Sequence, residues 1–195
     1  MVSPSLLVSE HEHVLAVQDE PLYEIVNGQR VELPPMSAYA TWIASCFHGQ
    51  LWSYVREKGL GMAVTEMLFV LDAEHNLRRR PDVAFVSTAR WPLDRALSMT
   101  GDWEVVPDLA VEVISPNDVF KDVLAKVREY FHYGVQAVWV IAPEEQQVYV
   151  YDAPTHVRIL IGQGELTGGE VVPGFRMPLG HLFQHTAAPT VAPAS

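Results

Sequence analysis

The stretch Pro107-Asp-Leu-Ala-Val-Glu-Val-Ile114 reads as the central strand of a covered sheet, because it is almost entirely hydrophobic apart from Glu112. An isolated ionised carboxylate is costly in an apolar interior, so Glu112 must be protonated, paired with a cation or bound to a metal. Upstream, Pro81-Asp-Val-Ala-Phe-Val86 is a second short apolar strand that begins with an acid, and Lys126 lies on a predicted helix downstream. Two acids and a lysine on adjacent elements indicate a site for a divalent metal beside a phosphate.

The alternation of side chains along a strand supports this interpretation. It places Asp82 on the same face as Ala84, and Glu112 on the same face as Ala110. If the two strands are neighbours with matching faces, both carboxylates point to one spot. Two carboxylates with a backbone carbonyl and waters form a natural shell for Mg²⁺ (or Mn²⁺), which can bind a phosphodiester oxygen and activate a water.

The lysine is placed by helical periodicity. A helix expected from Asp118 to His132 has an apolar stripe formed by Val119, Phe120, Val123, Leu124, Val127, Tyr130 and Phe131. At ~100° per residue, Lys126 falls only ~20° outside this stripe, so its ammonium can reach Glu112 while its carbon stem lies along the sheet. Asp122, one turn earlier, is either a positioning partner of Lys126 or an ordinary i,i+4 ion-pair partner.

The remaining elements predict an α+β fold in which a mixed central sheet is flanked by helices. Asn27-Gly28 indicates a hairpin over residues 22–33, and Ser37 is a plausible N-cap for a long helix that ends near Lys58. Residues 62–71 are expected to form one strand, and the irregular segment 87–106 suggests a flap beside the site. A crossover helix joins the strand of Glu112 to the strand at 137–142.

Composition limits the class of protein. The chain has 195 residues, 49% of them hydrophobic, and a formal net charge of −11, which argues against a broad coat of nonspecific nucleic-acid contacts. One cysteine favours a reducing compartment, and no apolar stretch is long enough to span a membrane. We expect a soluble cytoplasmic protein with a loose lead-in over 1–20, one domain over 21–185 and a disordered tail over 186–195.

Several fragments, in this order and spacing, resemble the Uma-type family of "putative restriction endonucleases", which have the PD-(D/E)xK nuclease-like fold. The fragments are Tyr23-Glu-Ile-Val-Asn-Gly28, Pro81-Asp-Val-Ala84, Val111-Glu-Val-Ile-Ser-Pro116, Asp122 with Lys126 and Tyr130, Gly134-Val135 and Val138-Trp-Val-Ile141. The resemblance covers most of the chain and implies a restriction endonuclease-like domain over 21–185.

The resemblance further implies that Asp82 and Glu112 are metal ligands of a DNA endonuclease. In the parent pattern the lysine would stand at position 114, which is Ile114 here, and Lys126 fits as its replacement on the helix. Family members often carry a histidine near the start of the long helix, where this chain has Tyr39 and Ala40. Cleavage of both strands of a duplex needs two sites, so a homodimer is expected for a restriction-like enzyme.

Each candidate residue also has a structural explanation. Asp82 is then an acid that caps a turn at the strand entry, Glu112 is paired with an arginine, and Lys126 is a surface lysine. Glu66, in an alternating strand, is a candidate third acid of the site, and so is Glu24 in the first hairpin, although a solvent-facing position is the simpler interpretation of both. The rival function is a non-catalytic module that keeps the nuclease fold for protein–protein interaction, and the negative charge favours it.

Overall fold

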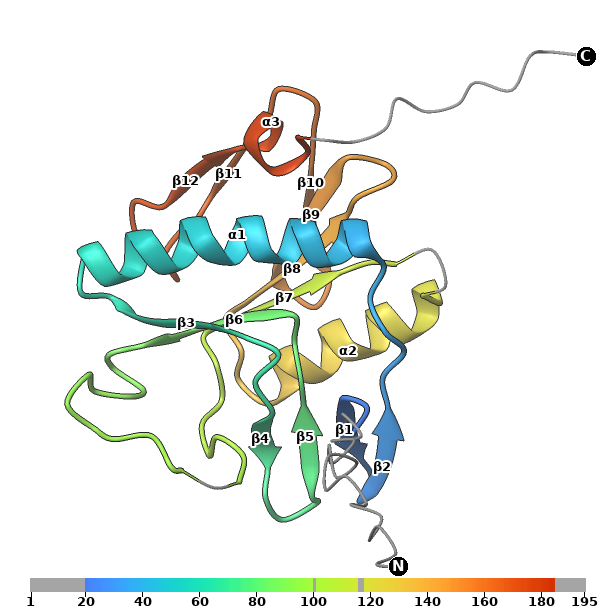
Figure 1. Ribbon diagram of the computed structural model, residues 1–195, viewed down its shortest axis with the longest axis vertical. Coiled ribbons are helices and arrows are strands. Elements are labelled where there is room, and N and C mark those ends of the chain that lie inside the picture. The colour runs from blue at the N-terminus through green and yellow to red at the C-terminus, as the bar shows by residue number, and fades with distance from the viewer. Residues whose placement is uncertain (1–19, 100, 116–117, 185–195) are drawn as a thin grey trace, which may run out of the picture.

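The computed structural model describes residues 20–99, 101–115 and 118–184, and a mixed six-stranded sheet is its largest element (Figure 1). From edge to edge its strands are β10 (His156–Ile161), β9 (Gln147–Ala153), β8 (Ala137–Ala142), β7 (Leu109–Val113), β6 (Val83–Ser87) and β3 (Gly61–Thr65). Helix α1 (Ala38–Glu57) covers one face and α2 (Phe120–His132) lies on the other (Figure 1). The expected α+β class with a mixed sheet flanked by helices is confirmed.

A second sheet of four strands stands beside the first, with the order β2-β1-β5-β4. Its strands are β1 (Tyr23–Val26), β2 (Gln29–Glu32), β4 (Phe69–Asp72) and β5 (Leu77–Arg79). The predicted hairpin is present, with Asn27 and Gly28 at φ of 52° and 74° in its tight turn. The single strand expected over 62–71 is instead divided into β3 and β4, because the chain turns at Glu66, where φ is 49°.

The C-terminal elements are small. Strands β11 (Glu165–Thr167) and β12 (Arg176–Pro178) form an antiparallel pair, and the short helix α3 (Leu179–Leu182) packs near α1. The tail expected over 186–195 lies outside the described residues, as does all of the lead-in expected over 1–20 except its last residue.

Helix α1 begins and ends where its sequence predicts. The Ser37 hydroxyl accepts a hydrogen bond from the backbone N–H of Ala40 at 3.1 Å, and Gly59 adopts a φ of 63° just after the C-cap. The residues at helical spacing on its inner side, including Ile43, Phe47 and Leu51, are fully buried against the sheet.

The crossover between β7 and β8 is formed by α2, and the two strands run parallel as predicted. The helix begins at Phe120 rather than Asp118, whose carboxylate instead accepts a hydrogen bond from the backbone N–H of Ser115 at 2.7 Å. Val119 and Phe120 are 53% and 68% exposed, so the expected apolar stripe is wrong in the first turn. Full burial on this helix is reached only farther along, at Val127 and Tyr130.

Alternation along β6 and β7 divides the core between the two faces of the sheet. Val83 and Val111 pack on the side of α1, whereas Ala84 and Ala110 pack on the side of α2 with Tyr130. Every residue of β7 is buried, including its acid. The side chains that continue the Ala84 and Ala110 rows therefore lie between the sheet and α2.

The segment expected to be a flap is instead attached to β4. The backbone N–H of Trp103 donates to the carbonyl of Leu68 at 2.9 Å, and its carbonyl accepts from Val70 at 3.0 Å. Trp103 is buried against Phe69 and Trp91. Aromatic packing on β4 thus holds this segment within the fold.

Strand β10 forms one edge of the large sheet. Its alternate residues Val157, Ile159 and Ile161 are exposed, although all three are aliphatic. This edge therefore presents a row of apolar side chains beside backbone groups that can pair with another strand.

Candidate active site

Neighbouring strands bring Asp82 and Glu112 together. The antiparallel register of β6 and β7 pairs Val83 with Val111, and one further step places Asp82 opposite Glu112. Directly opposed residues share a face of the sheet, with Cβ atoms about 5 Å apart. The Oδ2 atom of Asp82 also accepts a hydrogen bond of 2.6 Å from the backbone N–H of Val113. Both carboxylates therefore lie at one point on the α2 side, as the alternation predicted.

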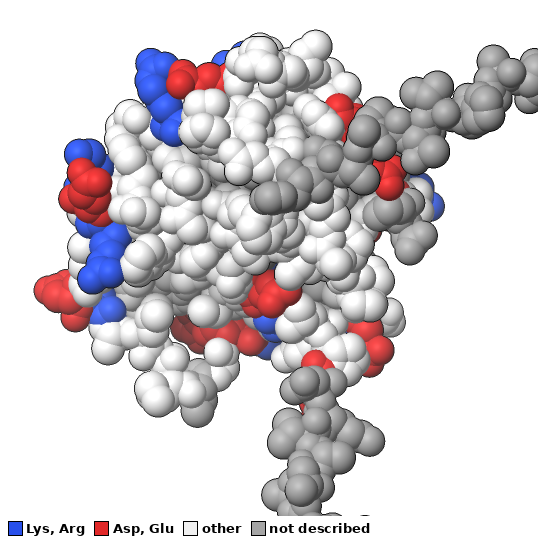
Figure 2. Space-filling model, turned by 45° about the horizontal axis from the view of Figure 1, so that its top comes forward, with Lys and Arg blue, Asp and Glu red and all other residues white. Residues whose placement is uncertain are grey.

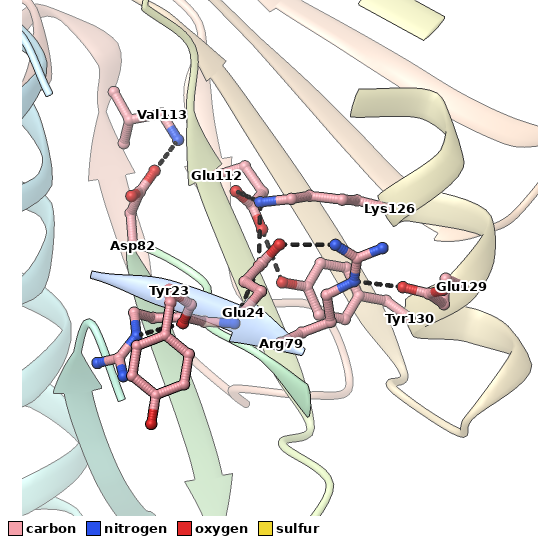
Figure 3. A network of polar contacts seen from close by, with 10 residues as sticks. Tyr23, Glu24, Arg79, Asp82, Glu112, Val113, Lys126, Glu129 and Tyr130 are labelled. Carbon is pink, nitrogen blue, oxygen red and sulfur yellow. Dashed lines mark hydrogen bonds and ion pairs between the residues drawn. The ribbon is translucent and has the colours of Figure 1, made fainter. Parts of the chain in front are cut away.

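Helix α2 delivers the lysine to the same point. The Nζ atom of Lys126 lies 3.1 Å from Oε2 of Glu112 (Figure 3). One turn later, the hydroxyl of Tyr130 donates to Oε1 of Glu112 at 2.7 Å. Because Lys126 and Tyr130 are four residues apart on one helical face, they hold the Glu112 carboxylate from two sides.

Glu24 is the member of this group that sequence reasoning missed. It is 1% exposed, and its Oε1 lies 3.2 Å from Nζ of Lys126, so the expectation of a solvent-facing residue is wrong. Arg79 donates to its Oε2 at 2.6 Å, and the backbone N–H of Arg80 donates to its Oε1 at 3.0 Å. Arg79 is also bonded to Glu129 on α2 (Figure 3). The structure thus links β1, β5 and α2 in one polar network.

The signal for Glu24 depends on a long-range pairing. Strand β1 pairs with β5, with Ile25 opposite Arg78, so Glu24 lies within reach of the following arginine. The run Arg78-Arg79-Arg80 was visible in the sequence, but its nearness to β1 requires the order of the smaller sheet.

Electrostatic interactions in the group oppose one another. Burial, together with the negative charge of Glu112, raises the pKa of Asp82 to about 7. Burial also raises the pKa of Glu112, although Lys126 acts in the opposite direction. Burial would raise the pKa of Glu24 as well, but Lys126 and Arg79 outweigh it, and the pKa is lowered. Burial would lower the pKa of Lys126, but Glu112 and Glu24 raise it and keep the ammonium charged.

The other acids considered from the sequence lie outside this network of side chains. Asp122 is exposed, and the ion pairs of Lys126 go to Glu112 and Glu24 rather than to Asp122. The side chain of Glu66 is exposed as expected, but its backbone carbonyl accepts a hydrogen bond from Arg80.

A hollow of about 510 Å³ opens beside these groups. Its charged lining consists of Glu66, Arg80, Asp82, Glu112, Asp118 and Lys126. The opposite wall comes from residues that flank the β1–β2 hairpin and from the connection into α1. None of the described residues of the segment expected to be a flap lines the hollow. A ligand in this hollow would touch both Asp82 and Glu112.

The charges of the network suit a divalent cation. Glu24, Glu112 and Glu129 share the two cations Lys126 and Arg79. Asp82 is a fourth acid beside Glu112. Burial is the main cause of the raised pKa of Asp82, and the negative charge of Glu112 adds to it. Among the described residues, no group of three or more His, Cys, Asp or Glu side chains is arranged to hold a metal. Mg²⁺ nevertheless fits, because it commonly takes only one or two carboxylates and keeps several waters.

Comparison with known proteins identifies the family of the chain. Residues 8–180 match the model of the family Uma2, described as "Putative restriction endonuclease". The chain belongs to this family. A solved structure titled as a putative nuclease belonging to DUF820, from Anabaena variabilis, superimposes on this Uma2 chain with a TM-score of 0.72 and 20% sequence identity. The match covers 84% of this chain and 90% of that chain. No curated protein matches the sequence.

The Uma2 chain therefore has the expected restriction endonuclease-like fold, and its family supports a nuclease. In the part of the chain that the structure describes, no helix combines the length and hydrophobicity needed to cross a bilayer.

Proposed function

We propose that the protein is a Mg²⁺- or Mn²⁺-dependent endonuclease that hydrolyses phosphodiester bonds of DNA. The observation that carries the proposal is the opposition of Asp82 and Glu112 on neighbouring strands, with Nζ of Lys126 3.1 Å from Glu112. Structural ion pairs alone leave Asp82 unexplained, because it has no cationic side-chain partner within ion-pair distance among the described residues. A half-buried carboxylate beside a second acid and an open hollow is typical of a cation site.

In this proposal Asp82 and Glu112 hold the metal, which would supply Lewis-acid stabilisation of the phosphate and lower the pKa of a water. The ammonium of Lys126 stabilises the negative charge that develops on the phosphate or orients the attacking water. Tyr130 fixes the Glu112 carboxylate, and Glu24 with Arg79 fixes Lys126. The chain's own groups are thereby held in place before the substrate arrives.

Two finer features belong to the proposal. An enzyme that cuts both strands of a duplex would act as a homodimer, since each copy supplies one site. The single cysteine is consistent with the reducing cytoplasm as its compartment.

Calorimetric titration with Mg²⁺ and with Mn²⁺ tests the metal site. A plasmid-nicking assay in the same buffer then tests cleavage. We expect the wild type to bind and nick, the double variant Asp82→Asn/Glu112→Gln to do neither, and Glu74→Gln, at an exposed turn, to match the wild type. Circular dichroism establishes that each variant is folded. A folded wild type that binds no metal at millimolar concentration would overturn the proposal and favour a protein-binding module.

A further inference from the structure

The hollow beside the acids has two chemically different sides. Carboxylates and Lys126 line one side, and the other is formed by Leu22, Leu33, Pro34, Pro35 and Met36. The apolar wall belongs to the hairpin and the connection into α1, close to the proposed scissile phosphate. Apolar side chains that line a pocket can stack against nucleobases that have left a duplex.

Arg80 supplies a fixed positive charge at the same hollow. Its Nε donates to the carbonyl of Tyr23 at 3.1 Å, and its Nη1 donates to the carbonyl of Glu66. Among the described residues no carboxylate forms an ion pair with it, so its charge is not neutralised by a neighbouring side chain. Lys126, the other cation in the lining, is already shared between Glu112 and Glu24.

The remaining cations give little support for a duplex. Seven of the thirteen Lys and Arg side chains form ion pairs within the protein, namely Arg30, Lys58, Arg78, Arg79, Arg90, Lys126 and Arg176. On the face that Figure 2 shows, blue side chains occur singly or beside red ones rather than as a continuous band. Duplex binding depends on many phosphate contacts, whereas a single strand can be held by stacking and few charges.

Resting on the proposed function, we propose that the substrate is a single-stranded nucleic acid or a single-stranded end. One unpaired base stacks on the wall at Pro34 and Pro35. Arg80 binds a phosphate next to the scissile phosphate, which the metal at Asp82 and Glu112 would bind. Four carboxylates and two cationic side chains line the hollow, so the hollow attracts phosphate only after a divalent cation has bound. A single-stranded substrate does not require two copies of the site.

Fluorescence anisotropy measures this preference without turnover. The probes are a labelled 20-nucleotide DNA strand, the same strand as RNA, and the DNA duplex, each titrated with the full-length protein in Ca²⁺ and in EDTA, with gels to confirm that the probe stays intact. We expect the single DNA strand to bind about tenfold or more tightly than the duplex, because one of its bases can stack on the wall. This binding should be seen only with Ca²⁺. Comparison of the DNA strand with the RNA strand shows which of the two nucleic acids the hollow binds more tightly.

Two wall variants, Pro35→Glu and Leu22→Glu, place a negative charge on exposed positions of the hollow. Each should weaken single-strand binding about tenfold. The matched control is Gln29→Glu, at an exposed position of the same hairpin that does not line the hollow, and it should change binding less than about twofold. Folding of each variant is checked by its thermal unfolding.

Equal or tighter binding of the duplex would overturn the inference, as would wall variants that behave like Gln29→Glu. Different outcomes would contradict the single-strand preference and the proposed hydrolysis. Plasmid nicking without single-strand preference removes only this inference, whereas single-strand preference without cleavage of any probe in Mg²⁺ or Mn²⁺ removes only the nuclease activity.

Discussion

Replacement of Asp82 by Asn should change how stability depends on pH. The ordinary pKa of the carboxyl is 3.8, and burial with the charge of Glu112 raises the pKa to about 7 in the folded protein. The folded state therefore holds this proton more tightly than the unfolded chain does. Stability is highest where Asp82 is protonated, and it falls as pH rises from about 4 to about 8.

The magnitude follows from the shift. One pKa unit corresponds to about 1.4 kcal/mol, so the whole shift is worth about 4 kcal/mol, of which about 3 kcal/mol falls between pH 5 and pH 8. Asn keeps an acceptor for the Val113 N–H but carries no charge. Asp82→Asn should therefore gain about 3 kcal/mol relative to the wild type on going from pH 5 to pH 8 without metal.

Urea unfolding at both pH values, in EDTA, measures this difference. Asp94→Asn removes an exposed carboxylate and should follow the wild type at both pH values. A ligand that binds only the folded state raises stability. Added Mg²⁺ should therefore stabilise the wild type at pH 8 but not Asp82→Asn, which lacks one of the two carboxylates proposed to bind the metal. Parallel pH profiles for the wild type and Asp82→Asn would refute the reasoning.

Two further changes test the network and the sheet. Lys126→Met leaves Glu112 and Glu24 buried without their shared cation, so urea unfolding at pH 7 should show a loss of about 3 kcal/mol; a loss below ~1 kcal/mol would mean that the pairs are not buried in solution. In Gly61→Ala the new Cβ would lie 2.1 Å from a backbone oxygen of β6, and a loss of about 3 kcal/mol is expected in the same assay. Gly49→Ala, at an exposed open position inside α1, is its control and should gain about 1 kcal/mol; equal effects of the two changes would contradict the packing of β3 on β6.

Local signals predicted the elements well. Ser37 and Gly59 mark the ends of α1, and Asn27-Gly28 marks the first hairpin, because caps and tight turns depend on a few adjacent residues. The alternation around Asp82 and Glu112 was equally informative, since it needed only that the two strands be neighbours.

The sequence did not reveal the burial of Glu24 or the start of α2. The burial of Glu24 follows from the pairing of β1 with β5, which joins residues more than fifty positions apart. The late start of α2, at Phe120 instead of Asp118, has a local cause, because the Asp118 carboxylate accepts a hydrogen bond from the backbone N–H of Ser115, three residues earlier. Propensity is a weak guide at both places, because a tertiary pairing buries Glu24 and a local side-chain hydrogen bond competes with the helix at Asp118.

The aliphatic edge strand β10 has a consequence for handling the protein. A net charge of −11 keeps molecules apart at low ionic strength, but the Debye length shortens from about 10 Å at 0.1 M salt to about 3 Å at 1 M. Concentrated salt removes that repulsion and strengthens the attraction between exposed Ile159 and Ile161 side chains of separate molecules. Dilute, low-salt buffers are therefore the conditions in which solution measurements will report on single chains rather than on strand-to-strand aggregates.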